Sequence, residues 1–161
     1  MKNRFEKPES NWDASEWQKY DETFAYCREN GLELKDFGTY YEVCQKSLDD
    51  LKAQKKAEIA AARYKREIAG VTVNGIPIDT GRDSQALITG AALAAMLDSE
   101  YSLNWKTSAG FIHLTAPEII AVAQTVRAHV QTCFDREGTL VSGVDAAQTA
   151  EELDAIDISF E

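Results

Sequence analysis

Residues 70–78 read Gly-Val-Thr-Val-Asn-Gly-Ile-Pro-Ile and indicate a β-hairpin in the middle of the chain. Two short apolar runs flank Asn74-Gly75, a dipeptide whose two residues both accept the positive φ angles of a type I′ turn. Pro77 cannot donate to a strand ladder, so its strand is predicted to lie at a sheet edge. On both sides of this hairpin, apolar residues recur at the three- and four-residue spacing of helices. The sequence therefore predicts an α+β fold.

After this hairpin the chain is predicted to form a helix, a second hairpin and a second helix. Thr80 or Asp83 is expected to cap the first helix. One face of this helix is made of small residues, which permit close approach of another element. That helix is predicted to run through Leu87, Ile88, Ala91, Ala95 and Leu97. The second hairpin covers residues 103–114, and Thr115 with Glu118 has the capping-box pattern that begins the next helix.

The C-terminal segment is predicted to be an acidic tail. Gly138 and Gly143 are expected to end the preceding helix, and a short amphipathic helix is expected over residues 146–156. From Glu137 to Glu161 the chain has seven acidic residues and no lysine or arginine. This tail is expected either to pair with basic residues of the same or another chain or to remain solvated.

Before the central hairpin the sequence predicts a small module followed by a long helix. Residues 1–12 are expected to be a leader, Asp13 to cap a helix, and residues 32–44 to form a hairpin. Ser47 is expected to open the long helix. The predicted division is residues 1–45, helix-plus-hairpin module; 46–69, connecting helix; 70–137, hairpin-helix-hairpin-helix domain; and 138–161, acidic tail with a short helix.

The long helix leaves two alternatives open. Leu51 and Ile59 are among its apolar positions, but a strict heptad places Lys55 and Glu58 in the seam, so the coiled-coil pattern is poor. The helix is therefore either a self-association element or an exposed connector. The poor heptads also fit a monomer.

Composition excludes several functional classes. The net charge of −10 weighs against nucleic-acid binding, which depends on neutralising phosphates. We expect no membrane span, because no apolar run is long enough, and no secretory signal peptide. The protein is therefore expected in a cytoplasm. Three cysteines without CxxC spacing are expected to be free, mostly buried thiols.

No catalytic or metal-binding arrangement is evident. His113 and His129 lack the paired spacing that places two ligands on one helix face, and no phosphate loop or nucleophile elbow is present. Cys133 and His129 are close enough on a helix to touch, but core packing is the preferred interpretation. We therefore expect no enzyme activity, no cofactor and no metal.

Aromatic residues are the candidates for partner binding, because they dominate the hot spots of protein interfaces. The competing interpretation assigns these aromatic residues to the core of the N-terminal module. The candidate partner-binding residues, with the two apolar positions of the long helix, are Trp17, Phe37, Tyr40, Tyr41, Leu51 and Ile59.

Several motifs follow one another between residues 58 and 137: the central hairpin, the Asp-Thr-x-Arg-x-Ser-Gln run from Asp79 to Gln85, Trp105-Lys-Thr, and His129-Val-x-x-Cys-Phe. With these motifs the segment resembles a domain of unknown function common in phage and prophage tail proteins. The resemblance implies a tail-fibre component, which would be part of the virion, or a fibre-assembly chaperone in the host cytoplasm, with tail-fibre proteins as partners. Because fibre partners are commonly trimeric, it favours a trimer or an asymmetric adaptor, although a monomer fits the poor heptads equally well. A small acidic protein that binds a basic site on a host protein is the alternative hypothesis.

Overall fold

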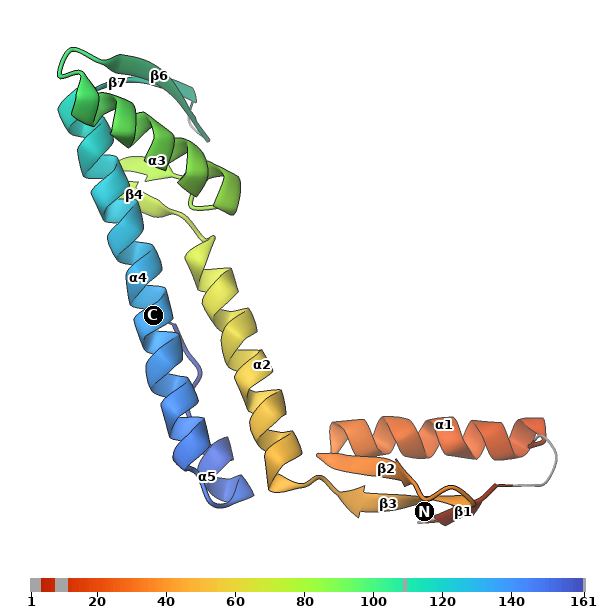
Figure 1. The fold of residues 1–161 in the computed structure, drawn as a ribbon. Helices are drawn as coiled ribbons and strands as arrows, with labels where there is room; N and C mark the ends of the chain where they lie inside the picture. The colour runs from red at the N-terminus through yellow and green to blue at the C-terminus, as the bar shows by residue number, and fades with distance from the viewer. Residues whose placement is uncertain (1–3, 8–11, 109, 161) are drawn as a thin grey trace. The chain divides into compact units, whose positions relative to one another are not determined.

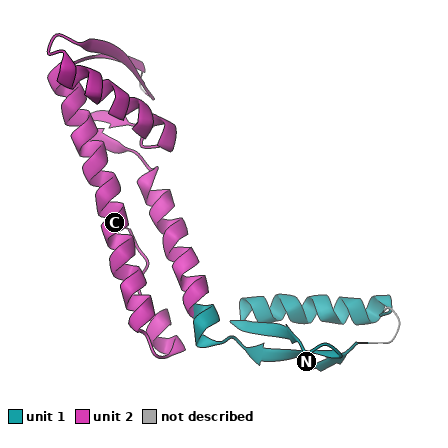
Figure 2. Ribbon diagram, viewed as in Figure 1, with its two compact units in different colours: residues 1–51 teal, residues 52–161 magenta. Residues whose placement is uncertain are grey.

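The computed structural model describes residues 4–7, 12–108 and 110–160. It divides the chain into two compact units, Met1–Leu51 (unit 1) and Lys52–Glu161 (unit 2), as Figure 2 shows. Five helices and small antiparallel sheets make up the described residues, so the predicted α+β class is confirmed. The elements are β1 (Arg4–Glu6), α1 (Ala14–Glu29), β2 (Leu32–Asp36), β3 (Tyr40–Gln45), α2 (Leu48–Glu67), β4 (Val71–Val73), β5 (Ile76–Ile78), α3 (Arg82–Leu97), β6 (Ser102–Thr107), β7 (Gly110–Thr115), α4 (Ala116–Ala146) and α5 (Ala150–Asp154).

Unit 1 is a three-stranded antiparallel sheet in the order β1-β3-β2, with α1 alongside it (Figure 1). The predicted cap is confirmed, because the Asp13 carboxylate accepts from the Glu16 amide within a full capping box. The predicted leader is wrong for residues 4–6, which form β1, while residues 1–3 and 8–11 lie outside the described residues. The physical reason is long-range: Phe5 is buried and opposes Tyr41 of β3.

The central hairpin has the predicted turn. Asn74 has a φ of 51° and Gly75 a φ of 80°, the two positive angles of a type I′ turn. Val73 and Ile78 from β4 and β5 are buried against Ile88 of α3 and Val122 and Val126 of α4. The hairpin therefore forms one side of a core cluster where α3 meets α4.

The second hairpin, β6 with β7, packs over a neighbouring core cluster. Leu114 packs with Ala95 of α3 and with Ala116 and Ile119 of α4. The capping box at Thr115 is present as predicted, with the Glu118 carboxylate accepting from the Thr115 amide at 2.8 Å. This cap ties the start of α4 directly to the end of β7.

Helices α2 and α4 run antiparallel and side by side (Figure 1). The Lys56 ammonium pairs with Asp145 at 2.5 Å, and the Arg63 Nε donates to Glu137 at 2.9 Å. Glu137 and Asp145 of the acidic segment therefore pair with basic residues of the same chain. This is one of the alternatives that the sequence left open.

A buried polar cluster joins the C-terminal end of α2 to the start of α3. The Thr80 hydroxyl donates to the main-chain oxygen of Glu67, and the Glu67 carboxylate pairs with Arg63 and accepts from the Gln85 amide. Because Thr80 is engaged here, it does not cap α3. The capping position is Gly81, without a side-chain hydrogen bond, so both residues predicted for the cap were wrong.

Helix α4 continues through Gly138 and Gly143, where the sequence predicted that it would end. A glycine costs a helix only about 1 kcal/mol, whereas burying a leucine or valine side chain stabilises by roughly 1.5–3 kcal/mol. Leu140 and Val144 lie buried on this final stretch, so packing outweighs propensity. The short helix that follows is also smaller than predicted, covering only Ala150–Asp154.

Two glycine-to-alanine changes are expected to act in opposite directions. Gly70 has a φ of 86°, and an added Cβ would lie 3.1 Å from the Ile78 main-chain oxygen, so Gly70→Ala should lower the free energy of unfolding by about 1–2 kcal/mol. Gly138 is helical with open space around it, so Gly138→Ala should raise that free energy by about 0.5–1 kcal/mol. Urea denaturation measures both, and destabilisation by Gly138→Ala would contradict an unbroken α4.

Candidate functional site

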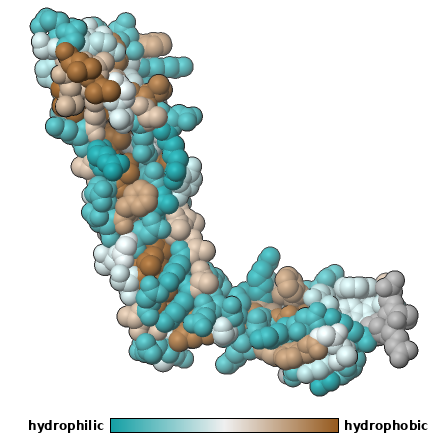
Figure 3. Space-filling model, in the orientation of Figure 1, coloured by the Kyte–Doolittle hydropathy of each residue, from teal (hydrophilic) through white to brown (hydrophobic). Residues whose placement is uncertain are grey.

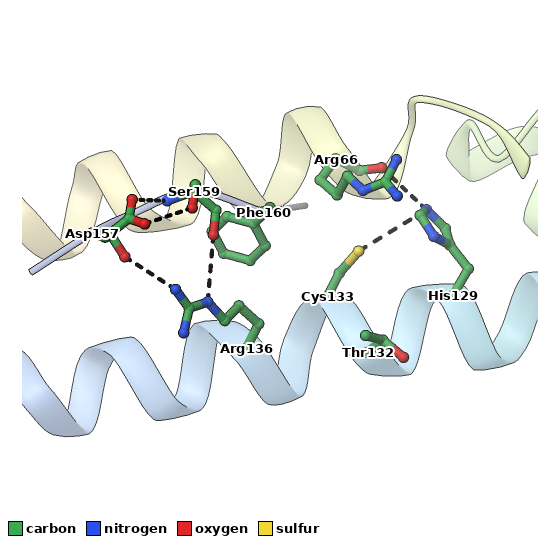
Figure 4. A pocket seen from close by; sticks show the side chains of 8 residues that line it. All are labelled: Arg66, His129, Thr132, Cys133, Arg136, Asp157, Ser159 and Phe160. Carbon is green, nitrogen blue, oxygen red and sulfur yellow. Dashed lines mark hydrogen bonds between the residues drawn. The ribbon is translucent and has the colours of Figure 1, made fainter.

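The pocket with the most reactive side chains lies in unit 2, between α2, α4 and the C-terminal segment (Figure 4). Its volume is about 400 Å³. The pocket is lined by Arg66, His129, Thr132, Cys133, Arg136, Asp157, Ser159 and Phe160. The pocket holds a histidine, a cysteine and two arginines. Because a neighbouring histidine can activate a cysteine as a nucleophile, the geometry of this pair decides whether the pocket is catalytic.

The His129 and Cys133 side chains do not form an activated pair. The His129 Nε2 lies 3.1 Å from the Arg66 main-chain oxygen and 3.2 Å from that of Glu67, so it donates to carbonyls at the end of α2. His129 Nε2 therefore carries the hydrogen. A general base would instead need a free lone pair on this nitrogen to accept the proton of the Cys133 thiol. Burial raises the pKa of the Cys133 thiol, which further disfavours the thiolate. His129 acts as a cap for α2, and Cys133 packs as a small apolar group.

Arg136 holds the C-terminal segment against α4. Its guanidinium donates to the main-chain oxygens of Asp157, at 3.2 Å, and Ser159, at 3.4 Å (Figure 4). The Asp157 carboxylate accepts from the Ser159 amide and hydroxyl, both at 2.9 Å, and these bonds lower the pKa of Asp157. The groups in this pocket thus fasten one segment of the chain to another.

Within the part of the chain that the structure describes, no three histidine, cysteine, aspartate or glutamate side chains come together as a group that could hold a metal ion. None of the described helices is both long and apolar enough to cross a membrane. Cys27, Cys44 and Cys133 are all free, as predicted, and Cys27 and Cys133 are buried.

The structure separates the predicted partner-binding aromatics of unit 1. Trp17 and Phe37 are about half exposed, whereas Tyr40 and Tyr41 are partly buried. The Tyr41 ring packs edge-on against the rings of Trp12 and Tyr20. Tyr40 stacks on Phe37 beneath the Arg4 guanidinium, which lies 3.6 Å from its ring centroid. These residues therefore do not form one surface.

The two predicted positions on α2 also differ. Leu51 is partly exposed, but Ile59 is fully buried inside the chain. The assignment of Ile59 to a partner-binding surface is therefore wrong. Its side chain packs within unit 2, where α2 lies beside α4, so this helix is not free to pair through Ile59 with another copy.

Unit 1 has a ladder of four aromatic rings, two of them exposed and two partly buried. We call this ladder the aromatic ridge: Trp12, Trp17, Tyr20 and Phe24. Neighbouring ring centroids are 4.7, 5.8 and 6.4 Å apart along the ladder. Burial raises the pKa of the Tyr20 hydroxyl, as expected for a ring at the base of the ladder. Trp17 and Phe24 present about half of their surface to solvent.

The aromatic ridge continues into a groove of about 200 Å³ between α1 and β2. Phe24 and Cys27 line the helix side of the groove, and Leu32 and Leu34 line the strand side. The charged residues at the groove are Arg28, Glu33 and Lys46. Because β2 lies at an edge of the described sheet, the groove runs beside a strand that can accept a further strand.

An apolar centre with a charged margin is the usual anatomy of a protein interface. Sequence reasoning named Trp17 but missed Phe24, Leu32 and Leu34 as surface residues. The spacing of Trp17, Tyr20, Phe24 and Cys27 did place them on one helix face. Spacing alone does not show that Trp17 and Phe24 stay about half exposed.

One comparison with known proteins identifies a family. The model of a family described as a domain of unknown function, DUF4376, matches residues 50–158. No curated protein and no solved structure matches the chain. The matched range covers α2 to α5, so the aromatic ridge and its groove lie outside it.

Proposed function

We propose that this chain, which belongs to the DUF4376 family, is a non-enzymatic protein of bacteriophage tail assembly that binds a tail-fibre protein. It acts either as a fibre-associated adaptor subunit of the virion or as a chaperone in the host cytoplasm that holds a fibre protein during assembly. In both forms unit 1 recognises the fibre protein, and unit 2 is the domain shared with the family.

The observation that carries this proposal is the aromatic ridge with its adjoining groove. Half-exposed tryptophan and phenylalanine side chains are costly for a small unit to leave in water, and residues of this kind supply most of the binding energy at interfaces. An apolar or aromatic segment of the partner is the chemistry that fits the ridge. An extended segment also gains main-chain hydrogen bonds along the edge of β2.

The phage context rests on the resemblance of residues 58–137 to tail-associated proteins. The motifs that carry it lie within the family match, from Asp79 to Phe134. The alternative of an acidic inhibitor that mimics nucleic-acid charge has no comparable support. Two acids of the acidic segment, Glu137 and Asp145, are already paired with basic residues of α2.

Removing ridge side chains is expected to abolish capture of the fibre protein. We expect Trp17→Ala and Phe24→Ala each to weaken binding by about 2 kcal/mol, roughly 30-fold in Kd, as for hot-spot residues. The tagged full chain is used to capture proteins from phage-producing cells, and captured proteins are identified by mass spectrometry. Binding of the captured fibre protein is then measured with each purified variant.

The matched control is Tyr26→Ala. Tyr26 lies on α1, is also partly exposed, and is about 180° around the helix from Trp17. Its removal should leave binding unchanged. Equal losses for all three variants, or capture of no tail protein, would contradict the proposal. Mass spectrometry of purified particles then separates the two forms, since only the adaptor subunit remains in the virion.

A further inference from the structure

The pocket between α2, α4 and the C-terminal segment holds two arginine side chains, Arg66 and Arg136. Figure 3 shows that mainly hydrophilic residues cover unit 2 along α2 and α4, whereas hydrophobic residues gather at the end that carries α3. Two guanidinium groups in one pocket are a local concentration of positive charge in a chain whose net charge is −10. The contacts that fasten the C-terminal segment use only part of what these side chains can donate.

The Arg66 guanidinium has no partner among the residues that the structure describes. The main-chain oxygen of Arg66 accepts from His129, but within that part of the chain the Arg66 side chain makes no hydrogen bond, ion pair or ring contact. Arg63, about one turn earlier on α2, is by contrast paired with two carboxylates. An arginine has five N–H donors and stays charged, so Arg66 presents a full positive charge to the pocket that it lines.

Arg136 is held in place but keeps donors to spare. Its two hydrogen bonds go to the main-chain oxygens of Asp157 and Ser159, which carry no formal charge. Among the described residues that line the pocket, the one carboxylate is that of Asp157, which accepts from the amide and hydroxyl of Ser159. These bonds, and to a lesser degree the Arg136 charge, lower the pKa of Asp157. Two guanidinium groups against one carboxylate leave the pocket with a net positive charge.

The two arginines lie at opposite ends of the pocket. Figure 4 shows Arg66 beside His129 at one end and Arg136 at the other, with Cys133 and Phe160 between them. The α4 residues of the lining run from His129 to Arg136, which corresponds to about 10 Å along the helix axis. A ligand that contacts both guanidinium groups must therefore be elongated.

The middle of the pocket is uncharged. Phe160 contributes an aromatic ring, and the Thr132 hydroxyl donates to the main-chain oxygen of Ala128 at 3.0 Å. Burial raises the pKa of the Cys133 thiol, so this side chain stays neutral. Along α4 the pocket therefore presents a positive charge, a neutral and partly apolar middle, and a second positive charge.

We propose that this pocket binds a short dicarboxylate, a small molecule with a carboxylate at each end of a hydrocarbon chain. One carboxylate pairs with Arg66, the other pairs with Arg136, and the chain lies against Phe160. The planar arginine fork matches a carboxylate through two parallel hydrogen bonds. The pocket volume of about 400 Å³ is in the usual range of small-molecule sites.

The charge of the pocket favours carboxylates over phosphates. Two carboxylates balance the two guanidinium groups, whereas a bisphosphate would bring roughly twice as much negative charge beside Asp157. This inference concerns unit 2 and is independent of the fibre-binding role assigned to unit 1.

The test measures the binding of glutarate to the purified full chain by isothermal titration calorimetry. Valerate is the matched ligand, because it has the same carbon chain and a single carboxylate. Glutarate should bind saturably at one site per chain, with a Kd of about 1 mM or below. Valerate should bind at least about tenfold more weakly, because one of the two arginines then stays unpaired.

Replacing Arg66 with methionine should weaken glutarate binding at least about tenfold and remove most of the difference between glutarate and valerate. The main-chain oxygen that His129 contacts is retained in this variant, and circular dichroism should show that the fold is unchanged. Arg66→Lys keeps the charge but loses the fork, so its affinity for glutarate should lie between those of the wild type and Arg66→Met.

Lys65→Met is the control, because Lys65 is exposed, lies about 100° around α2 from Arg66 and does not line the pocket. It removes the same unit charge and should leave the affinity for glutarate unchanged at physiological salt. The proposal would be overturned by no saturable glutarate binding up to about 10 mM, by equal binding of valerate, by equal losses for Arg66→Met and Lys65→Met, or by glutarate binding that Arg66→Met leaves unchanged. Trp17→Ala should not change glutarate binding, which keeps this test separate from that of fibre binding.

Discussion

Replacing Arg63 with methionine is expected to lower the free energy of unfolding by about 3 kcal/mol, because it leaves buried carboxylates without their cation. The Arg63 side chain is only 12% exposed, and it pairs with Glu67 and Glu137, whose side chains are 4% and 20% exposed. Methionine retains an apolar stem of similar length, so the loss reports the ion pairs more than the packing.

The size of the effect follows from what remains after the substitution. Glu67 keeps the Gln85 amide as a neutral donor, and Glu137 loses the guanidinium Nε that lies 2.9 Å away. A carboxylate removed from water without a counter-charge is destabilised far more than an exposed one. Urea denaturation followed by circular dichroism gives the free energy directly.

Lys56→Met is the matched control for Arg63→Met. Lys56 and Asp145 are also joined across α2 and α4, but their side chains are well exposed, so their pair should contribute less than about 1 kcal/mol. The variant Arg63→Met/Glu67→Met should recover part of the loss, because the most deeply buried unpaired carboxylate is gone. Equal losses of unfolding free energy for Lys56→Met and Arg63→Met would show that burial does not determine how much each ion pair stabilises the fold.

Replacing Ile59 with alanine is expected to lower the free energy of unfolding by about 3 kcal/mol, the usual range for removing a fully buried isoleucine side chain. Ile59 has no exposed surface. The loss combines the transfer of the removed carbons with the cavity left in the core. The thermal midpoint Tm, measured by calorimetry, should fall accordingly, while fibre capture below the transition should be unchanged.

The same substitution at Ile68 is the control for Ile59→Ala. Ile68 follows the end of α2 and is about one third exposed, so Ile68→Ala should cost less than about 1 kcal/mol. If Ile59→Ala kept the wild-type Tm but lost binding or self-association, Ile59 would belong to a partner-binding surface. That result would contradict the burial of Ile59 in the core.

The accuracy of the sequence predictions differs between local and long-range features. The turn at Asn74-Gly75 and the capping boxes at Asp13 and Thr115 are where the sequence places them. Each depends on residues within four positions of one another, so a short stretch contains all the atoms involved. The cap of α3 failed because Thr80 bonds to Glu67, thirteen residues away, in place of its own helix.

The candidate sites show the same limit. Helical spacing placed Trp17 and Phe24 on one face, and it placed Leu87 and Leu97 in the apolar pattern of α3. Spacing does not show which apolar residues find a neighbour. The structure buries Ile88 and leaves Leu87 exposed, although the two are adjacent in sequence and equally apolar.

The sequence by itself determined the α+β class, the central hairpin and the order of helices and strands after it, since φ preferences, caps and periodicity act within a few residues. Only the tertiary structure decided that residues 4–6 complete a sheet, that α4 continues past Gly138, and that Ile59 is core. Each of these depends on apolar surface removed from water by a distant segment. That free energy is set by the neighbour and not by the residue itself.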